Sequence, residues 1–260
     1  MSINSGGEAR LYLFFLDIDG TIYDGERVAD EVIDAITRAR AQGHKVFINT
    51  ARAYIGMPEQ VYGLPVDGFV NSFGLEVFAE GRFIHRNFIP RCRVLEIAKY
   101  AFDNGKRIYF EGEIRIDINQ KREESLCPDN IDEFEGMLGK SGVCKFVFVD
   151  KPTDSDVAAF SSEFDFYGIE AIAKGYTKAR GIQIVEEHYG ASREDTVAIG
   201  DTAGDIDMVK YAGVGISMGN GTPNLKSCAK YVTKPFWHFG VAYAIDRLLE
   251  GDLDALKNNE

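Results

Sequence analysis

Short apolar stretches alternate with helix-like segments at both ends of the chain, and this alternation limits the possible folds more than any other feature. Near the N-terminus, residues 11–16 and 44–50 are strand-like, and the segment between them, 27–43, has apolar residues at helical spacing. Residues 66–72 add a third short apolar stretch. A strand, a helix and a second strand at this spacing form a βαβ unit, which predicts a parallel sheet.

The C-terminal third of the sequence has the same alternation. Its strand-like and helix-like segments are 178–190 (helix), 195–201 (strand), 205–213 (helix), 214–220 (strand), 222–229 (helix), 230–234 (strand) and 237–251 (helix). The two ends of the chain together predict one α/β core with a doubly wound parallel sheet of the Rossmann-like kind.

The middle of the chain has a different pattern. Helical segments are expected at 91–105, 130–138 and 153–164, and consecutive strands at 107–118, 144–150 and 164–173. Consecutive strands favour an α+β insert with its own small sheet. We therefore expect an α+β domain at 83–175, inserted between core segments 1–82 and 176–260.

Composition and charge exclude several classes of partner. The net charge of −12 and the pI near 4.9 argue against nucleic acid and against an anionic membrane surface. No apolar run approaches the roughly 20 residues that span a bilayer, and the polar segment Met1–Arg10 lacks the apolar core of a signal peptide, so we expect a loose leader there. Nothing in the sequence indicates an interface from which an oligomeric state could be inferred.

The cysteines favour a reducing compartment. The chain has four, at positions 92, 127, 144 and 228, with no CxxC spacing and no histidine at metal-ligand spacing. We expect reduced, mostly buried thiols and a cytoplasmic protein.

Two aspartates interrupt the most apolar stretch near the N-terminus. The strand at 11–16 runs directly into Asp17 and Asp19, and Gly20 follows at once. Alternation along a strand puts residues i and i+2 on the same side. Two carboxylates placed so near each other resist joint ionisation unless a cation or a proton is present. An ordinary turn built on Asp-Gly is the alternative interpretation.

Other polar residues are expected at the same edge of the sheet, because ligands of open α/β sheets bind outside the carboxyl ends of the strands. Thr50 ends a predicted strand, Lys178 begins a helix, and Asp201 and Asp205 follow another strand. Taken singly, each has a plain explanation as a loop hydroxyl, a solvated charge or a helix-start acid. The joint pattern is much more specific than its parts.

The chemistry of this set is coherent. Carboxylates such as Asp17 and Asp201 are ligands suited to Mg²⁺, while the Thr50 hydroxyl, neighbouring backbone N–H groups and the Lys178 ammonium suit a phosphate group. An aspartate can act as a nucleophile that forms an aspartyl-phosphate. A second aspartate two residues on can protonate the leaving oxygen and later deprotonate water.

Five segments of the sequence carry a family resemblance. They are LDIDGTI, INTAR, YTKARGI, GDTAGDIDM and GISMGNGTPNLKSCAKYVT. In this order they resemble the haloacid dehalogenase (HAD) superfamily, and in particular the Cof-type phosphatases, whose cap domain is inserted between the second and third motifs. The resemblance implies a HAD-type core with an inserted α+β cap. It also implies a Mg²⁺-dependent phosphatase for a small phosphorylated metabolite, with a sugar phosphate as the expected substrate.

The resemblance implies catalytic and metal-binding roles at four positions. Asp17 is expected to be the nucleophile and a Mg²⁺ ligand. Asp19 is expected to be the general acid and base and to offer its backbone carbonyl to the metal. Asp201 is expected to complete the metal site, with Asp205 mainly behind it.

Substrate-binding roles follow from the same resemblance. Thr50, Ala51 and Lys178 are expected to bind phosphate. Arg52 lies in TAR, where the family usually has TGR, and is expected to contact the substrate or the cap. Gly204 stands where the family usually has Asn, so either the loop needs a positive φ or extra room for a bulky substrate, or the position has drifted.

Three other functions remain open from the residues. A phosphomutase uses two aspartates on the same fold and transfers the phosphoryl group to a sugar hydroxyl. A receiver-like signalling module also combines acids, a threonine and a lysine, but it is smaller and has no need of a large insert. A non-catalytic protein that binds a phosphorylated metabolite is the third alternative.

Overall fold

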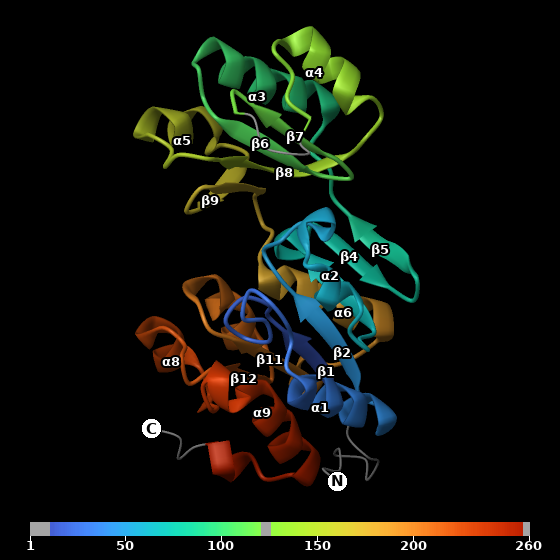
Figure 1. Cartoon of the computed structure of the whole chain (residues 1–260). Coiled ribbons are helices and arrows are strands. Elements are labelled where there is room, and N and C mark those ends of the chain that lie inside the picture. Colours follow the sequence, from blue (N-terminus) through green and yellow to red (C-terminus); the bar gives the residue numbers. More distant parts are fainter. Residues whose placement is uncertain (1–10, 121–125, 257–260) are drawn as a thin grey trace. The chain divides into compact units, whose positions relative to one another are not determined.

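The computed structural model describes residues 11–120 and 126–256, so the predicted leader at Met1–Arg10 lies outside the described residues. Two compact units are formed. The larger, the core unit, comprises residues 1–51, 57–85 and 177–260, and the smaller, the cap unit, comprises 52–56 and 86–176. Figure 1 shows a sheet covered by helices in the core unit and a second sheet with its own helices in the cap unit.

The core unit is built on an eight-stranded sheet in the order β13-β12-β11-β1-β2-β3-β4-β5. The strands from β13 to β3 are parallel, and β4 is antiparallel to β3. In chain order the strands are β1 (Leu13–Leu16), β2 (Lys45–Asn49), β3 (Gly68–Asn71), β4 (Glu76–Ala79), β5 (Arg82–Arg86), β11 (Thr196–Gly200), β12 (Val214–Ser217) and β13 (Tyr231–Val232).

Helices pack against this sheet, and α1 packs with α9 while α6 packs with α7. The helices of the core unit are α1 (Asp30–Ala41), α2 (Glu59–Tyr62), α6 (Lys178–Tyr189), α7 (Ile206–Tyr211), α8 (Pro223–Cys228) and α9 (Gly240–Glu250). The apolar face predicted for 27–43 is the buried side of α1, and Val32, Ala35 and Ile36 belong to it. The predicted doubly wound core is confirmed.

One hairpin of the core sheet was not expected from the sequence. Strands β4 and β5 turn at Glu80 and Gly81, both with positive φ (54° and 74°), which is the geometry of a tight hairpin. The predicted start of the insert, residue 83, falls inside β5. The short strands lack a clear period-two pattern, so the hairpin signal was limited to the Glu-Gly pair.

The cap unit is α+β, as predicted. Its antiparallel sheet has the order β7-β6-β8-β10-β9. The strands are β6 (Ile108–Gly112), β7 (Arg115–Ile118), β8 (Val143–Phe148), β9 (Phe164–Tyr167) and β10 (Glu170–Ala173), and the helices are α3 (Arg91–Asp103), α4 (Ile131–Leu138) and α5 (Asp154–Phe160). The segment 164–173, expected as a single strand, forms the hairpin of β9 and β10, because Gly168 at φ 66° permits a tight turn.

The two faces of the cap sheet differ in chemistry. One face supplies Ile108, Phe110 and Phe146 to an apolar core shared with the helices. The other face carries polar residues of the β6–β7 hairpin, which the sequence predicts to be solvated because polar residues usually face water: Arg107, Tyr109, Glu111, Arg115 and Asp117. This expectation is wrong for Glu111, which is 6% exposed and pairs with Arg115 at 2.8 Å.

That charged face continues across the neighbouring strands. Lys145 is buried and lies 2.6 Å from Glu170 and 3.4 Å from Glu111. Asp117 is also buried, and Arg115 lies 3.2 Å from it. Of the five hairpin residues in question, Arg107 is exposed and pairs with Asp150. Ion pairing makes burial of these charges tolerable.

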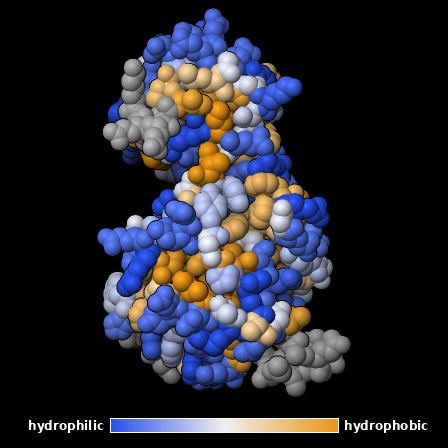
Figure 2. All heavy atoms as spheres, turned by 45° about the vertical axis from the view of Figure 1, so that its right-hand side comes forward, coloured by the Kyte–Doolittle hydropathy of each residue, from blue (hydrophilic) through white to orange (hydrophobic). Residues whose placement is uncertain are grey.

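The exposure of the surface side chains and of the cysteines agrees only partly with the predictions from the sequence. Figure 2 shows a mainly hydrophilic surface with some hydrophobic patches on the face in view. No helix in the described part of the chain is long and apolar enough to cross a membrane. The four cysteines are free, but only Cys144 is buried, so the prediction of mostly buried thiols is wrong.

The start of α5 provides a test of the cap unit's stability. Asp156 is buried and accepts hydrogen bonds from Lys106 Nζ (2.8 Å), Tyr100 Oη (2.7 Å) and the backbone N–H of Thr153 (2.8 Å). Burial acts to raise its pKa, but these donors outweigh burial and hold the pKa of Asp156 well below its usual range. Thr153 and Asp156 form a capping box at the start of α5.

We expect Asp156→Ala to lower the free energy of unfolding by about 2 kcal/mol at pH 7, because a cap and charged hydrogen bonds are lost. Since the folded-state pKa is depressed, this stabilisation is complete above the unfolded-state value and shrinks as pH falls below about 4. Urea denaturation at several pH values measures both effects. The exposed neighbour Asp154 is the control, and an equal loss in Asp154→Ala would contradict the account.

Candidate active site

Asp17 and Asp19 lie where β1 ends, but they face different surroundings. Asp17 is buried, and its backbone N–H continues the sheet by donating to Ile199 O at 3.0 Å. Asp19 is exposed. The strict alternation expected from the sequence is lost after Leu16, because the chain turns so that the Ile18 carbonyl accepts three successive backbone N–H groups, those of residues 21–23.

Lys178 connects the two acidic segments of the site. It is the first residue of α6, whose N-cap Thr177 accepts a hydrogen bond from Arg180 N. Its Nζ lies 2.6 Å from Asp17 Oδ1 and 2.5 Å from Asp205 Oδ1, and all three side chains are buried. Burial acts to lower the pKa of Lys178, but the two carboxylates outweigh it and raise that pKa above its ordinary value. Lys178 therefore remains protonated.

The Asp205 carboxylate supports the loop that presents Asp201. Its Oδ2 accepts hydrogen bonds from the backbone N–H groups of Asp201 (3.0 Å) and Thr202 (2.8 Å). Gly200 allows this approach, because a Cβ at that position would lie 2.4 Å from Asp205 Cγ. Both oxygens of Asp205 are thus engaged by the protein itself.

Asp201 completes a group of three carboxylates. One carboxylate oxygen from each of Asp17, Asp201 and Asp205 lies within 4.8 Å of the others. Thr21 Oγ1 donates to Asp201 Oδ1 at 3.3 Å, and a Cβ at Gly20, where φ is 76°, would lie 2.3 Å from Asp201 Oδ2. A left-handed glycine is therefore needed at position 20.

Electrostatics at this group favour a divalent cation. Burial and the nearby Asp205 raise the pKa of Asp201 to about 6, and burial also raises the pKa of Asp17, against the pull of Lys178. When all three carboxylates are ionised, they and the single ammonium leave two net negative charges in a confined volume. Hard oxygen ligands with this charge fit Mg²⁺.

Two of the predicted phosphate ligands, Thr50 and Ala51, directly follow β2, the neighbour of β1 in the sheet. Thr50 is buried directly after β2, and its N–H donates to Val70 O at 2.9 Å. Ala51 follows and is the last residue of the core unit before the chain enters the cap unit at residue 52. Arg52 belongs to the cap unit, where its Nη1 donates to Gly56 O at 3.2 Å. The core unit therefore brings together the predicted site residues except Arg52, with direct contacts among Asp17, Asp201, Asp205 and Lys178.

Gly204 lies in the short 3₁₀ turn Ala203–Asp205, between Asp201 and α7. Its φ is not positive, and a Cβ there would meet only Thr202 Oγ1, at 3.6 Å. The possibility that the loop needs a left-handed glycine is therefore wrong. The other two explanations, extra room for a bulky substrate and drift of the position, remain.

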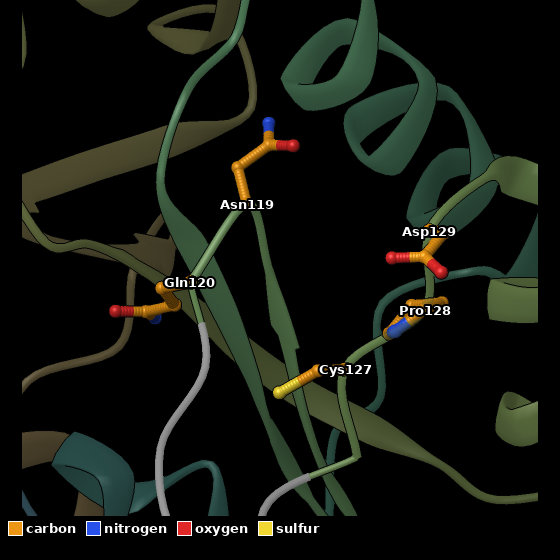
Figure 3. Close-up of a pocket in the computed structure, with 5 residues that line it drawn as sticks. All are labelled: Asn119, Gln120, Cys127, Pro128 and Asp129. Carbon is orange, nitrogen blue, oxygen red and sulfur yellow. The ribbon is translucent and has the colours of Figure 1, made fainter.

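A hollow elsewhere in the cap unit contains none of the predicted site residues. Figure 3 shows Asn119 and Gln120 at the end of β7, opposite Cys127, Pro128 and Asp129 on the chain that leads to α4. The Asn119 amide donates to the carbonyls of Ala101 (3.0 Å) and Lys106 (2.9 Å). The Asn119 side chain therefore joins the end of β7 to α3 and to the segment before β6 within the cap unit.

Comparison with known proteins identifies the family. The family model of haloacid dehalogenase-like hydrolases matches residues 14–245, which is most of the chain. The chain therefore belongs to the haloacid dehalogenase-like hydrolases. The resemblance inferred from the motifs is confirmed.

Curated relatives match over nearly their full length. "Putative phosphatase YkrA" of Bacillus subtilis is 29% identical over 252 residues, which cover 91% of this chain and 97% of that protein. The 5-amino-6-(5-phospho-D-ribitylamino)uracil phosphatase YitU of the same organism is 24% identical over 267 residues and covers 90% and 96%. The phosphoglycolate phosphatase of Methanothermobacter thermautotrophicus is 26% identical over 238 residues and covers 90% and 97%.

Solved structures agree with the fold. A hypothetical protein from Geobacillus kaustophilus is similar with a TM-score of 0.79 at 25% identity, covering 93% of this chain and 99% of that one. A sugar phosphatase of HAD subclass IIB is similar with a TM-score of 0.75 at 23% identity, covering 91% and 98%. Family and relatives together support the predicted enzyme class: the chain is a phosphatase of the HAD family.

The contrast between two glycines tests the geometry of the acidic loop. We expect Gly204→Ala to leave the fold intact and to stabilise it by up to about 1 kcal/mol, because the backbone conformation and space allow a Cβ. Gly200→Ala should destabilise strongly, since its Cβ would overlap Asp205. Thermal unfolding of both variants measures the difference. Equal stability of the two would show that Asp205 does not hold the described position.

Proposed function

We propose that the chain hydrolyses the phosphate monoester of a small metabolite through an aspartyl-phosphate on Asp17, with Mg²⁺ as cofactor. One observation carries the proposal: Lys178 Nζ contacts the buried residues Asp17 and Asp205 at 2.6 and 2.5 Å, in a group of three carboxylates that half-buried Asp201 completes. Phosphoryl transfer requires mainly positioning and charge neutralisation, and this group offers both.

Asp17 is the proposed nucleophile. Lys178 donates a hydrogen bond to Oδ1, which orients the carboxylate, and Oδ2 is the proposed attacking atom. Attack forms a bond between Oδ2 and phosphorus and breaks the bond from phosphorus to the ester oxygen. The Lys178 ammonium offsets the negative charge of the phosphoryl group, and the Thr50 hydroxyl with the Ala51 backbone N–H binds its oxygens.

Asp19 is the proposed general acid and base. It first gives a proton to the departing ester oxygen and later takes one from the water that attacks the phosphorus of the aspartyl-phosphate. Release of inorganic phosphate regenerates the Asp17 carboxylate. The exposure of Asp19, in contrast to buried Asp17, suits a group that exchanges protons with solvent.

Asp17, Asp201 and the backbone carbonyl of Asp19 are the proposed Mg²⁺ ligands. Asp205 lies behind them, because its oxygens already accept hydrogen bonds from Lys178, Asp201 and Thr202. When bound, Mg²⁺ supplies Lewis-acid charge that reduces the repulsion between the carboxylates and the phosphate.

For the substrate, we propose a chemical class and no single compound. Relatives are named for phosphorylated small molecules, a phosphoribitylamino-uracil and phosphoglycolate, and a structural neighbour is named a sugar phosphatase. We therefore propose a sugar phosphate or a similar phosphorylated metabolite, with selectivity supplied by Arg52 and the cap unit and with room for the leaving group at Gly204. A phosphate-release screen over many esters with Mg²⁺ ranks the substrates.

Two substitutions separate the proposed roles of the aspartates. Asp17→Asn should abolish turnover of p-nitrophenyl phosphate, because a neutral amide does not attack phosphorus. Asp19→Asn should lower kcat by about 100-fold to 10,000-fold, the usual range for lost general acid–base catalysis. Colorimetric measurement of phosphate release gives both values. Near-normal turnover in Asp17→Asn would overturn the nucleophile assignment.

A further inference from the structure

We propose that Asn49 is a positioning residue that fixes Lys178 in the phosphate site. The proposal rests on the proposed role of Lys178. Asn49 is the last residue of β2, directly before Thr50, and it is fully buried. Its Nδ2 donates a hydrogen bond to the backbone carbonyl of Lys178 at 3.0 Å, across 129 positions of sequence.

The chemistry of this position needs an explanation. The strand residues before it, Phe47 and Ile48, are fully buried and apolar, and an apolar side chain at 49 would avoid the cost of desolvating an amide. Within the described part of the chain, Asn49 Oδ1 has no hydrogen-bond partner. The amide therefore carries the cost of a buried unsatisfied acceptor while its other end holds the Lys178 carbonyl.

The bond acts at the point where the lysine side chain begins. Lysine has a flexible four-carbon stem, so the position of its ammonium depends on how firmly its backbone is held. Lys178 is the first residue of α6, where the backbone N–H groups have no partner within the helix. Asn49 restrains that residue from the neighbouring strand, and Thr50, the next residue along, is itself a proposed phosphate ligand.

The turn after β3 also joins Thr50 to the start of α6. The turn Ser72–Gly74 follows β3, and its N–H at Phe73 donates to Thr50 O at 3.3 Å. The turn also lies against the start of α6, since a Cβ at Gly74 would lie 2.8 Å from Gly181 N. Ser72 and Phe73 have positive φ (49° and 58°), a conformation that non-glycine residues adopt at an energetic cost.

These contacts define one frame for two phosphate-binding groups. Thr50 is fixed by β3 and by the turn, and Lys178 is fixed by Asn49, whose backbone continues directly into Thr50. The distance between the Thr50 hydroxyl and the Lys178 ammonium therefore depends on residues 49 and 50 and their hydrogen bonds. Loss of the Asn49 amide should move the ammonium relative to Asp17 without removing any group that touches the substrate.

The test is a double-mutant cycle of Asn49→Leu and Lys178→Met. Leu is close to Asn in size but cannot donate a hydrogen bond. We expect Asn49→Leu to lower kcat/KM for p-nitrophenyl phosphate by roughly 10-fold to 100-fold, the scale of a misplaced catalytic group. It should also weaken inhibition by inorganic phosphate. The double variant should be no less active than Lys178→Met alone, because Asn49 acts only through Lys178.

Thr233→Val is the matched control. Thr233 is buried, and its Oγ1 donates at 2.7 Å to the carbonyl of Gly240, the first residue of α9, so it makes the same kind of bond at a helix start away from the site. This variant should lose thermal stability but keep the phosphate inhibition constant of the wild type. If Asn49 had only a structural role, Asn49→Leu would likewise lose thermal stability and keep the phosphate inhibition constant of the wild type.

The outcomes separate the two proposals. Wild-type kcat/KM in Lys178→Met would overturn the proposed function. If Lys178→Met is impaired, an unchanged phosphate inhibition constant in Asn49→Leu, or losses that multiply in the double variant, would overturn the role of Asn49. Should Asn49→Leu fail to fold, Asn49→Ala removes the amide donor without adding bulk or charge and is measured with the same criteria.

Discussion

The contact of one buried lysine with two buried aspartates is the interaction on which the rest of the site depends. Lys178 neutralises part of the charge of Asp17 and Asp205, and without it three carboxylates would be confined together in a medium of low polarity. The parallel sheet makes this contact possible, because it brings the ends of β1 and β11 side by side. Gly20 and Gly200 then allow Asp201 and Asp205 to approach.

The fold class could be predicted because most helices and strands carry a local signal. The apolar stretch that became β1, the amphipathic α1 and the capping box of α5 are visible in short windows of sequence. The hairpin of β4 and β5 carries little such signal. The buried charges of the cap sheet could not be predicted, because burial of Glu111 and Lys145 depends on partners from three different strands, β6, β8 and β10.

The candidate site shows the same division. Motif order placed Asp17, Lys178 and Asp201 at one edge of a sheet, and the structure brings them together around Asp205. Their catalytic roles stay predictions. Sequence reasoning missed Asn49, because its significance lies in a contact with a residue 129 positions away, and it missed the different exposure of Asp17 and Asp19, because a turn at Ile18 ends the alternation.

Calorimetric titration of the full chain with Mg²⁺ tests most directly the claim that two net negative charges are confined at this site. The account predicts one ion bound per chain, a heat signal lost in Asp201→Asn, and phosphatase activity that disappears on chelation and returns with Mg²⁺, whereas Ca²⁺, which is larger and less strict in geometry, inhibits. Full activity after exhaustive chelation, or Mg²⁺ binding unchanged by Asp201→Asn, would contradict it.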